Sequence, residues 1–226
     1  MERVLKTPKE LAQAAATFFV ECAREAVEAR GMFIAAIPGG RTPERFFRLL
    51  GGVASMPWEN THLFLTDERF VRSDDPENTE RMVRELFADK VPLKGLHPIR
   101  TDVSTPEEAA RLVSEELKSV GGVFDLVILG VGADGHVASL FPDHTWEEND
   151  FPYIAVHNAP KPPPERVSLS LSTINAARNV LILASGTEKV AILQSLRSGE
   201  AAHLPVGKVR PAMSETTIFI DEAAAS

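Results

Sequence analysis

Residues 125–142 read DLVILGVGADGHVASLFP, and this stretch decides the class of fold. The run at 125–129 is short and almost continuously apolar, which is typical of a strand buried on both faces of a parallel sheet. A glycine-rich loop follows, and Pro142 leaves room for only a very short helix after it. A buried strand that ends in a polar, glycine-rich loop predicts a ligand site at the carboxyl end of a parallel sheet.

The same alternation continues along the chain on both sides of this stretch. Apolar spacing of three and four, with start and stop signals, predicts helices at 8–30, 43–50, 77–87, 105–120 and 187–196. Short apolar runs predict strands at 32–37, 62–65, 125–129, 153–156, 167–171, 180–184 and 217–220. We therefore expect an α/β fold, a Rossmann-type open sheet that is mainly parallel and covered by helices on both faces. The length of 226 residues and the even composition favour a single domain, 1–226.

Composition restricts the partners. The net charge of −8 disfavours nucleic acid, whereas a small anionic substrate remains possible if a local basic cluster exists. No apolar run approaches the ~20 residues that cross a bilayer, and no signal peptide opens the sequence, so we expect a cytoplasmic protein. The single cysteine, Cys22, lies on the apolar side of the first helix and is expected to be a small buried hydrophobe. The sequence is compatible with a monomer or a small homo-oligomer.

The first unusual strand end is Gly39-Gly40-Arg41-Thr42-Pro43. Two glycines allow backbone N–H groups to approach a ligand, and the start of a helix attracts an anion. This is a candidate phosphate-binding loop, although a plain strand-to-helix turn can have the same sequence pattern.

Two further strand ends carry charge. Asp67-Glu68-Arg69 follows residues 62–65, with Asn78 further on, and is either a solvated turn or a holder for Arg69. Lys189 follows Ser185-Gly186-Thr187, on a solvated helix face or at a second anion site. The proline-rich segment 159–164 is either a linker or a rigid wall that carries Lys161 and Arg166 toward a site.

The loop at 130–136 is the most informative end. Gly130, Gly132 and Gly135 match the dinucleotide pattern G-x-G-x-x-G, but Asp134 would place a carboxylate beside the pyrophosphate and the following helix is too short. The alternative is a loop that presents Asp134 and His136. Histidine is the usual general base near neutral pH, and a nearby carboxylate fixes its tautomer.

The sequence lacks the motifs of metal sites, serine nucleophiles and nucleotide-hydrolase loops. The remaining histidines show no zinc-ligand spacing, and we expect neither a metal nor an organic cofactor. There is no G-x-S-x-G elbow for a serine nucleophile and no phosphate-binding loop of the nucleotide-hydrolase type.

Taken together, these stretches resemble the 6-phosphogluconolactonases, which are related to the glucosamine-6-phosphate deaminases and share a sugar-phosphate-isomerase-like scaffold. The matching stretches are Gly39 to Pro43, Asp67-Glu68-Arg69 with Asn78, Leu129 to Pro142, Lys161-Pro162-Pro163 with Arg166, and Gly186 with Lys189. Ala138-Ser139-Leu140-Phe141-Pro142 looks like the lactonase branch. Pro38 and Val137 depart from the family, which commonly has a serine or threonine and a threonine at these positions.

The resemblance implies hydrolysis of 6-phospho-D-glucono-1,5-lactone to 6-phosphogluconate, a step of the pentose phosphate pathway. Joined to the residue chemistry, it makes His136 the base that activates water, with Asp134 orienting it or sharing the role. Arg69 or backbone N–H groups of 39–42 would stabilise the oxyanion. The expected substrate-binding residues are Gly39, Gly40, Arg41, Thr42, Asp67, Asn78, Gly132, Arg166 and Lys189. Two alternatives remain: an amino-sugar-phosphate deaminase or isomerase, and a non-catalytic sugar-phosphate sensor.

Overall fold

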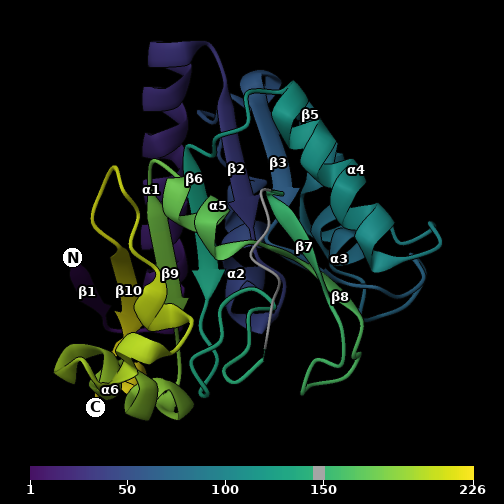
Figure 1. Cartoon of the computed structure of the whole chain (residues 1–226). Helices are drawn as coiled ribbons and strands as arrows, with labels where there is room; N and C mark the ends of the chain where they lie inside the picture. The colour runs from purple at the N-terminus through teal and green to yellow at the C-terminus, as the bar shows by residue number, and fades with distance from the viewer. Residues whose placement is uncertain (145–150) are drawn as a thin grey trace.

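A seven-stranded parallel sheet forms the centre of the computed structural model, which describes residues 1–144 and 151–226, except for the side chains of residues 41 and 42. In spatial order its strands are β1 (Glu2–Leu5), β10 (Thr217–Asp221), β9 (Val180–Ala184), β6 (Leu126–Gly130), β2 (Phe33–Ile37), β3 (Thr61–Leu65) and β5 (Gly95–His97). All neighbouring strands pair in parallel. The predicted mainly parallel sheet is thus confirmed (Figure 1).

Helices cover both faces of this sheet. The longer ones are α1 (Pro8–Arg30), α2 (Arg41–Leu50), α3 (Thr79–Leu86), α4 (Pro106–Ser119), α5 (Leu171–Ala176) and α6 (Val190–Ser198). The remaining helices are α7 (Glu222–Ala225), η1 (Trp58–Asn60), η2 (Ala88–Lys90), η3 (Thr187–Lys189), η4 (Glu200–His203) and η5 (Val206–Lys208). Along the chain, β1, β2, β3 and β5 follow one another in one direction across the sheet. The later strands β6, β9 and β10 follow one another in the opposite direction. Right-handed crossovers therefore place α1, α2 and α3 on one face, and α4 and α5 on the other (Figure 1).

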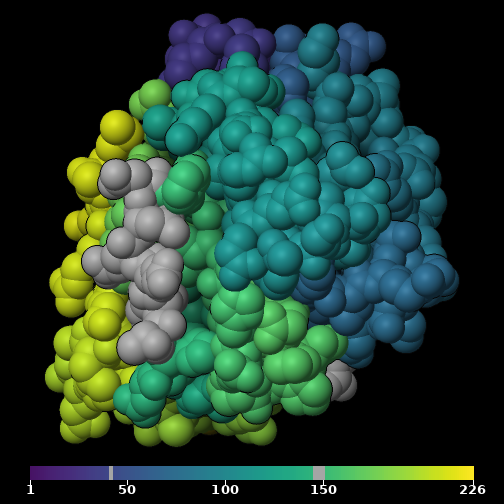
Figure 2. Space-filling model, turned by 45° about the vertical axis from the view of Figure 1, so that its right-hand side comes forward, coloured from purple at the N-terminus to yellow at the C-terminus, as the bar shows by residue number. Residues whose placement is uncertain are grey.

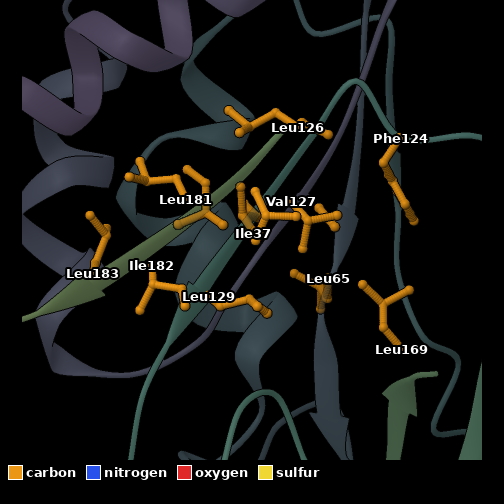
Figure 3. Packing of buried hydrophobic residues seen from close by; sticks show 14 of the residues in the cluster. Ile37, Leu65, Phe124, Leu126, Val127, Leu129, Leu169, Leu181, Ile182 and Leu183 are labelled. Carbon is orange, nitrogen blue, oxygen red and sulfur yellow. The ribbon is translucent and has the colours of Figure 1, made fainter. Parts of the chain in front are cut away.

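The core explains why the central strands lack alternation. Every residue of β2 and β9 is buried, as are four of the five in β6. Figure 3 shows Val127 and Leu129 of β6 amid the cluster, with Leu181 and Leu183 of β9 to one side and Leu65 of β3 to the other. Because both faces are covered, each strand must be apolar throughout.

The first helix follows its predicted limits. The Thr7 hydroxyl accepts a hydrogen bond from the Glu10 backbone N–H at 3.1 Å, and Gly31 ends the helix with a φ of 77°. Cys22 is buried on the inner side of this helix, as expected, and burial raises the pKa of its thiol to about 12.

A second, antiparallel sheet was not predicted. It comprises β4 (Asp67–Arg69), β8 (Arg166–Leu169) and β7 (Tyr153–Val156), in that order. The interpretation of 153–156 and 167–171 as members of the parallel alternation is therefore wrong. Only a loop joins β7 to β8, and such a short connection permits antiparallel pairing but no parallel crossover.

Smaller differences have local causes. β1 was missed because three of its four residues are exposed at the sheet edge and show no apolar pattern. Leu171 starts α5 instead of ending a strand, since the Ser170 hydroxyl accepts from the Thr173 N–H at 3.2 Å and caps a new helix.

Candidate active site

Four neighbouring strands of the parallel sheet end at the same edge. β9, β6, β2 and β3 are adjacent, and their arrows point the same way in Figure 1. The segments that leave these ends are the ones that the sequence singled out: 185–189, 131–136, 38–42 and 66–69. Parallel pairing thus gathers residues from four distant parts of the chain along one edge.

Asp134 and His136 form a close pair in the loop after β6. His136 Nδ1 lies 2.5 Å from Asp134 Oδ1, so the ring donates its Nδ1–H to the carboxylate. Gly132 makes the pair possible, because a Cβ on this residue would lie 2.0 Å from His136 Nδ1 and 2.2 Å from Asp134 Oδ1. Gly135 adopts a φ of 83°, which favours glycine and turns the loop back.

Lys161 reaches the same pair from the proline-rich segment. Its Nζ lies 3.0 Å from Asp134 Oδ2 and 3.2 Å from His136 Nδ1. Since Nδ1 donates to Asp134, the lysine hydrogen bond goes to the carboxylate. Burial opposes ionisation of Asp134, but hydrogen bonds from His136 and Lys161 outweigh it and lower the pKa of Asp134 to about 2. Both oxygens of this carboxylate are thus occupied.

The other ring nitrogen of His136 is available for chemistry. Within residues 1–144 and 151–226, Nε2 has no hydrogen-bond partner, and the side chain remains 22% exposed. The ring packs against Phe141 with centroids 4.8 Å apart. Burial lowers the pKa of His136 despite the raising effect of Asp134, and Lys161 adds to the lowering. A neutral imidazole with its lone pair on Nε2 follows.

Strand β4 divides three charged residues between its two faces. Successive side chains alternate, so Asp67 and Arg69 share one face and Glu68 takes the other. Asp67 Oδ2 accepts from the Ser139 hydroxyl at 2.6 Å, which ties it to the loop of His136. Arg69 stands opposite Arg166 in the antiparallel register, and its Nη1 donates to the Glu77 carbonyl at 2.9 Å.

Glu68 is a buried anchor. Its carboxylate accepts backbone hydrogen bonds from Arg69 at 2.8 Å, from Thr79 at 2.8 and 2.9 Å, and from Glu80 at 2.9 Å. Burial raises the pKa of Glu68 to about 7, although these N–H groups act in the opposite direction. The residue joins β4 to the start of α3, so the hypothesis of a solvated turn at 67–69 is wrong for this position.

Asn78 caps α3 and lies beside the glycine loop. Its Oδ1 accepts from the Arg81 N–H at 2.9 Å, whereas its buried Nδ2 has no partner in the part of the chain that the structure describes. The neighbouring Thr79 packs so closely on Gly39 that a Cβ there would lie 2.8 Å from Thr79 Oγ1. Gly40 has a φ of 98° at the start of α2. These contacts place the glycine loop and the cap of α3 together.

Arg166 is buried in β8, only 6% exposed, and holds the proline-rich segment. Its Nε donates to the Pro163 carbonyl at 3.0 Å, and Nη2 donates to the carbonyls of Lys161 and Pro162 at 3.0 and 3.2 Å. Nη1 lies 3.5 Å from Ser139 Oγ and retains donor capacity. The segment is therefore a wall fixed onto the site and not a linker.

Lys189 and Arg41 are the other cations that the sequence predicted for the site. Lys189 lies in η3 at the carboxyl end of β9, is 17% exposed, and has Glu188 Oε1 at 3.9 Å from its Nζ. The side chains of Arg41 and Thr42 lie outside the described part of the chain, so their predicted roles stay predictions.

The sequence offered Lys161 only through one of two alternatives, a rigid proline-rich wall that carries it toward a site, and not among the expected binding residues. Ser139 was not an expected site residue, because its contact with Asp67 arises only when the loop after β6 folds against β4.

Within residues 1–144 and 151–226, no group of three or more His, Cys, Asp and Glu side chains is placed to hold a metal ion. None of the helices described has the length and apolar character needed to cross a membrane.

Known proteins match the chain over most of its length. The family described as glucosamine-6-phosphate isomerases/6-phosphogluconolactonase matches residues 6–218. The 6-phosphogluconolactonase of Rattus norvegicus is 34% identical, over 98% of this chain and 91% of its own length. That of Streptomyces coelicolor is 35% identical, over 99% and 93%.

Solved structures agree with this match. The crystal structure of 6-phosphogluconolactonase from Thermotoga maritima superposes with a TM-score of 0.89 at 27% identity, covering 98% of this chain and 99% of the other. The resemblance drawn from the motifs is confirmed: the chain belongs to the family of glucosamine-6-phosphate isomerases and 6-phosphogluconolactonases.

Proposed function

We propose that this protein hydrolyses 6-phospho-D-glucono-1,5-lactone to 6-phosphogluconate, a reaction of the pentose phosphate pathway. The observation that carries the proposal is the pairing of His136 with Asp134 at the edge where four parallel strands end. The names of the relatives support the choice of substrate.

In this mechanism His136 is the general base. Its Nδ1–H bond to Asp134 leaves the lone pair on Nε2, which removes a proton from the attacking water. The new C–O bond forms at the lactone carbonyl, and the bond to the ring oxygen then breaks. The imidazolium returns the proton to the departing alkoxide, and Asp134 stabilises the imidazolium in between. Because both oxygens of Asp134 are occupied, this carboxylate orients the base and does not share its role.

One set of hydrogen-bond donors would stabilise the oxyanion that develops at the lactone carbonyl, and a second set would bind the substrate phosphate. Arg69 and the backbone N–H groups of 39–42 are the candidates for the oxyanion, because a preorganised donor acts where charge develops. Arg41, Thr42, Lys189 and Nη1 of Arg166 would hold the phosphate, since guanidinium groups match phosphate oxygens. We assign further substrate contacts to Gly39, Gly40, Asp67, Asn78 and Gly132.

Turnover of freshly made 6-phosphogluconolactone tests the proposal. Product formation is coupled to 6-phosphogluconate dehydrogenase and compared with spontaneous hydrolysis in an enzyme-free control. Release of ammonia from glucosamine 6-phosphate would instead indicate the deaminase alternative. Binding of phosphosugars without turnover of either compound would indicate a sensor.

The proposal includes no metal and no organic cofactor, because the sequence offers no ligand spacing for a metal and no dinucleotide fingerprint that fits. Dialysis against EDTA should leave kcat/KM unchanged. A loss of activity that a single divalent ion restores would contradict this part of the proposal.

We also propose that residues 1–226 act as one catalytic domain in the cytoplasm, without a nucleic-acid partner. β1 and β10, from opposite ends of the sequence, are neighbours in one sheet, which supports a single domain. The net charge of −8 supports the absence of a nucleic-acid partner.

A further inference from the structure

His157 lies between two carboxylates outside the site described above. It follows β7, and its Nε2 lies 2.6 Å from Oε1 of Glu107 in the first turn of α4. Its Nδ1 contacts Oε2 of Glu165, which immediately precedes β8. Its carbonyl oxygen accepts from His144 Nε2 at 2.6 Å. One residue thus joins α4, both arms of the β7–β8 hairpin and the segment after Pro142.

The geometry defines the charge of this ring. A carboxylate faces each nitrogen, so both nitrogens must donate, and only the imidazolium has two N–H groups. The hydrogen bond with Glu165 is the largest cause that raises the pKa of His157, and Glu107 contributes in the same direction. A neutral ring would turn a lone pair toward one of the two carboxylates and lose that contact.

The loop that His157 fixes is the one that carries Lys161. Within this loop the Ala159 N–H donates to the Pro164 carbonyl at 2.9 Å, and the Phe70 N–H donates to the Glu165 carbonyl at 2.9 Å. Lys161 stands between these anchors, with its Nζ 3.0 Å from Asp134 Oδ2. Figure 2 shows the green surface of the hairpin against the teal surface of α4. The contact between His157 Nε2 and Glu107 Oε1 joins these two elements.

We propose that His157 is a positioning residue, which clamps the 157–165 loop between Glu107 and Glu165 so that Lys161 stays on the Asp134–His136 pair. The inference rests on the proposed function only for its effect on rate. Lys161 is the link between the clamp and the site: its charge favours the neutral form of His136 and fixes the second oxygen of Asp134. Arg166 still holds the Lys161 carbonyl at 3.0 Å when the clamp opens, so it is the Lys161 side chain that leaves Asp134. His136 then binds a proton more tightly.

An NMR titration of His136 tests this without any turnover. The ring is assigned from the signal that disappears in His136→Gln, and its pKa is measured in the wild type, His157→Gln, Lys161→Gln and the double variant. We expect the pKa of His136 to rise in His157→Gln, toward the value in Lys161→Gln. In the double variant His157→Gln should add nothing, because residues that act in series are not additive.

Two matched controls accompany the titration. His203→Gln removes an exposed histidine of η4, and its His136 pKa should equal that of the wild type. On α4, Glu107→Gln should raise the pKa of His136, whereas Glu115→Gln, which loses its ion pair with Arg111, should not. Chemical-shift maps of each variant confirm that the fold is kept.

The outcomes separate the alternatives. An unchanged His136 pKa in a folded His157→Gln protein would overturn the proposal. An equal rise with and without Lys161 would overturn it too, because His157 would then act by its own charge. If the wild type fails to hydrolyse the lactone while the titration behaves as expected, the proposed function fails and the clamp stands. If both hold, kcat of His157→Gln should fall roughly 3- to 10-fold with little change in KM.

Discussion

Gly132 and His136 are so close that a Cβ on the glycine would overlap the imidazole, at 2.0 Å from Nδ1. The Gly132 N–H also donates to the His136 carbonyl at 2.9 Å, which closes the loop around the pair. The second glycine of the apparent dinucleotide pattern therefore makes room for a side-chain pair and not for a pyrophosphate.

Gly132→Ala should therefore separate His136 from Asp134 while the core of the sheet stays intact. We expect kcat/KM for the lactone to fall by about 10²-fold, since a displacement of about 1 Å in a catalytic group can cost that much. Gly130→Ala is the matched control, because a Cβ there meets nothing within 4 Å. Steady-state kinetics of both variants, with circular dichroism for folding, would check this. Equal losses in the two variants would contradict it.

Glu68→Gln tests the buried anchor of α3. Burial raises the pKa of Glu68 to about 7 in the folded protein, above the ordinary glutamate value of 4.5, so folding favours the protonated form. The stability that Glu68 contributes is thus full below pH ~4.5, falls as pH rises to about 7, and is constant above, a loss on the order of 3 kcal/mol. Glutamine does not titrate, so the difference in free energy of unfolding between wild type and variant should shrink over this range.

Urea unfolding at several pH values measures that difference, with the exposed Glu59→Gln as the control for general charge effects. A difference that grows with pH would show that the backbone N–H groups outweigh burial and keep Glu68 ionised.

The sequence predicted the parts of the fold that local pattern determines. β2, β6 and β9 are continuously apolar and lead into glycine loops, so both their burial and their ends could be read. The limits of α1 followed from Thr7 and Gly31, which act on their own helix.

The rest depends on partners that lie far away in the chain. β4 is short and charged, and it is a strand only because β8 pairs with it. Lys161 could be suspected, but its contact with Asp134 requires the hairpin to fold back over the sheet edge. The alternation of Asp67, Glu68 and Arg69 between two faces follows from this pairing, because only a paired strand gives successive side chains opposite directions.

Lys189→Ala tests the phosphate site at the end of β9. Lys189 is a mostly buried cation on a chain of net charge −8, and we propose that it contacts the substrate phosphate. KM for 6-phosphogluconolactone should rise about tenfold or more, while hydrolysis of unphosphorylated gluconolactone stays unchanged. Lys118→Ala is the control, because Lys118 precedes β6 at the opposite edge of the sheet. Equal losses on both substrates would remove Lys189 from the phosphate site.

The pH dependence of the rate tests His136 most directly. Burial lowers the pKa of His136 below the ordinary histidine value of 6.5, and the neutral form is the active one. kcat/KM should therefore rise with pH through one ionisation below 6.5 and then level off, after subtraction of spontaneous hydrolysis at each pH. Asp134→Asn should lower this pKa further, because the carboxylate that favours the imidazolium is gone, and should also reduce the rate.

His136→Gln completes the test. Glutamine keeps some hydrogen bonding but accepts no proton at this pH, so kcat should fall by about 10²–10⁴-fold and the ionisation should vanish from the profile. The variant should still bind 6-phosphogluconate, since the proposed phosphate contacts at Arg166 and Lys189 are untouched; isothermal titration measures this. A folded His136→Gln protein that keeps most of the wild-type rate would rule out His136 as the base. Asp67 would be the next candidate, because its Oδ2 accepts from Ser139 in the same loop, 2.6 Å away.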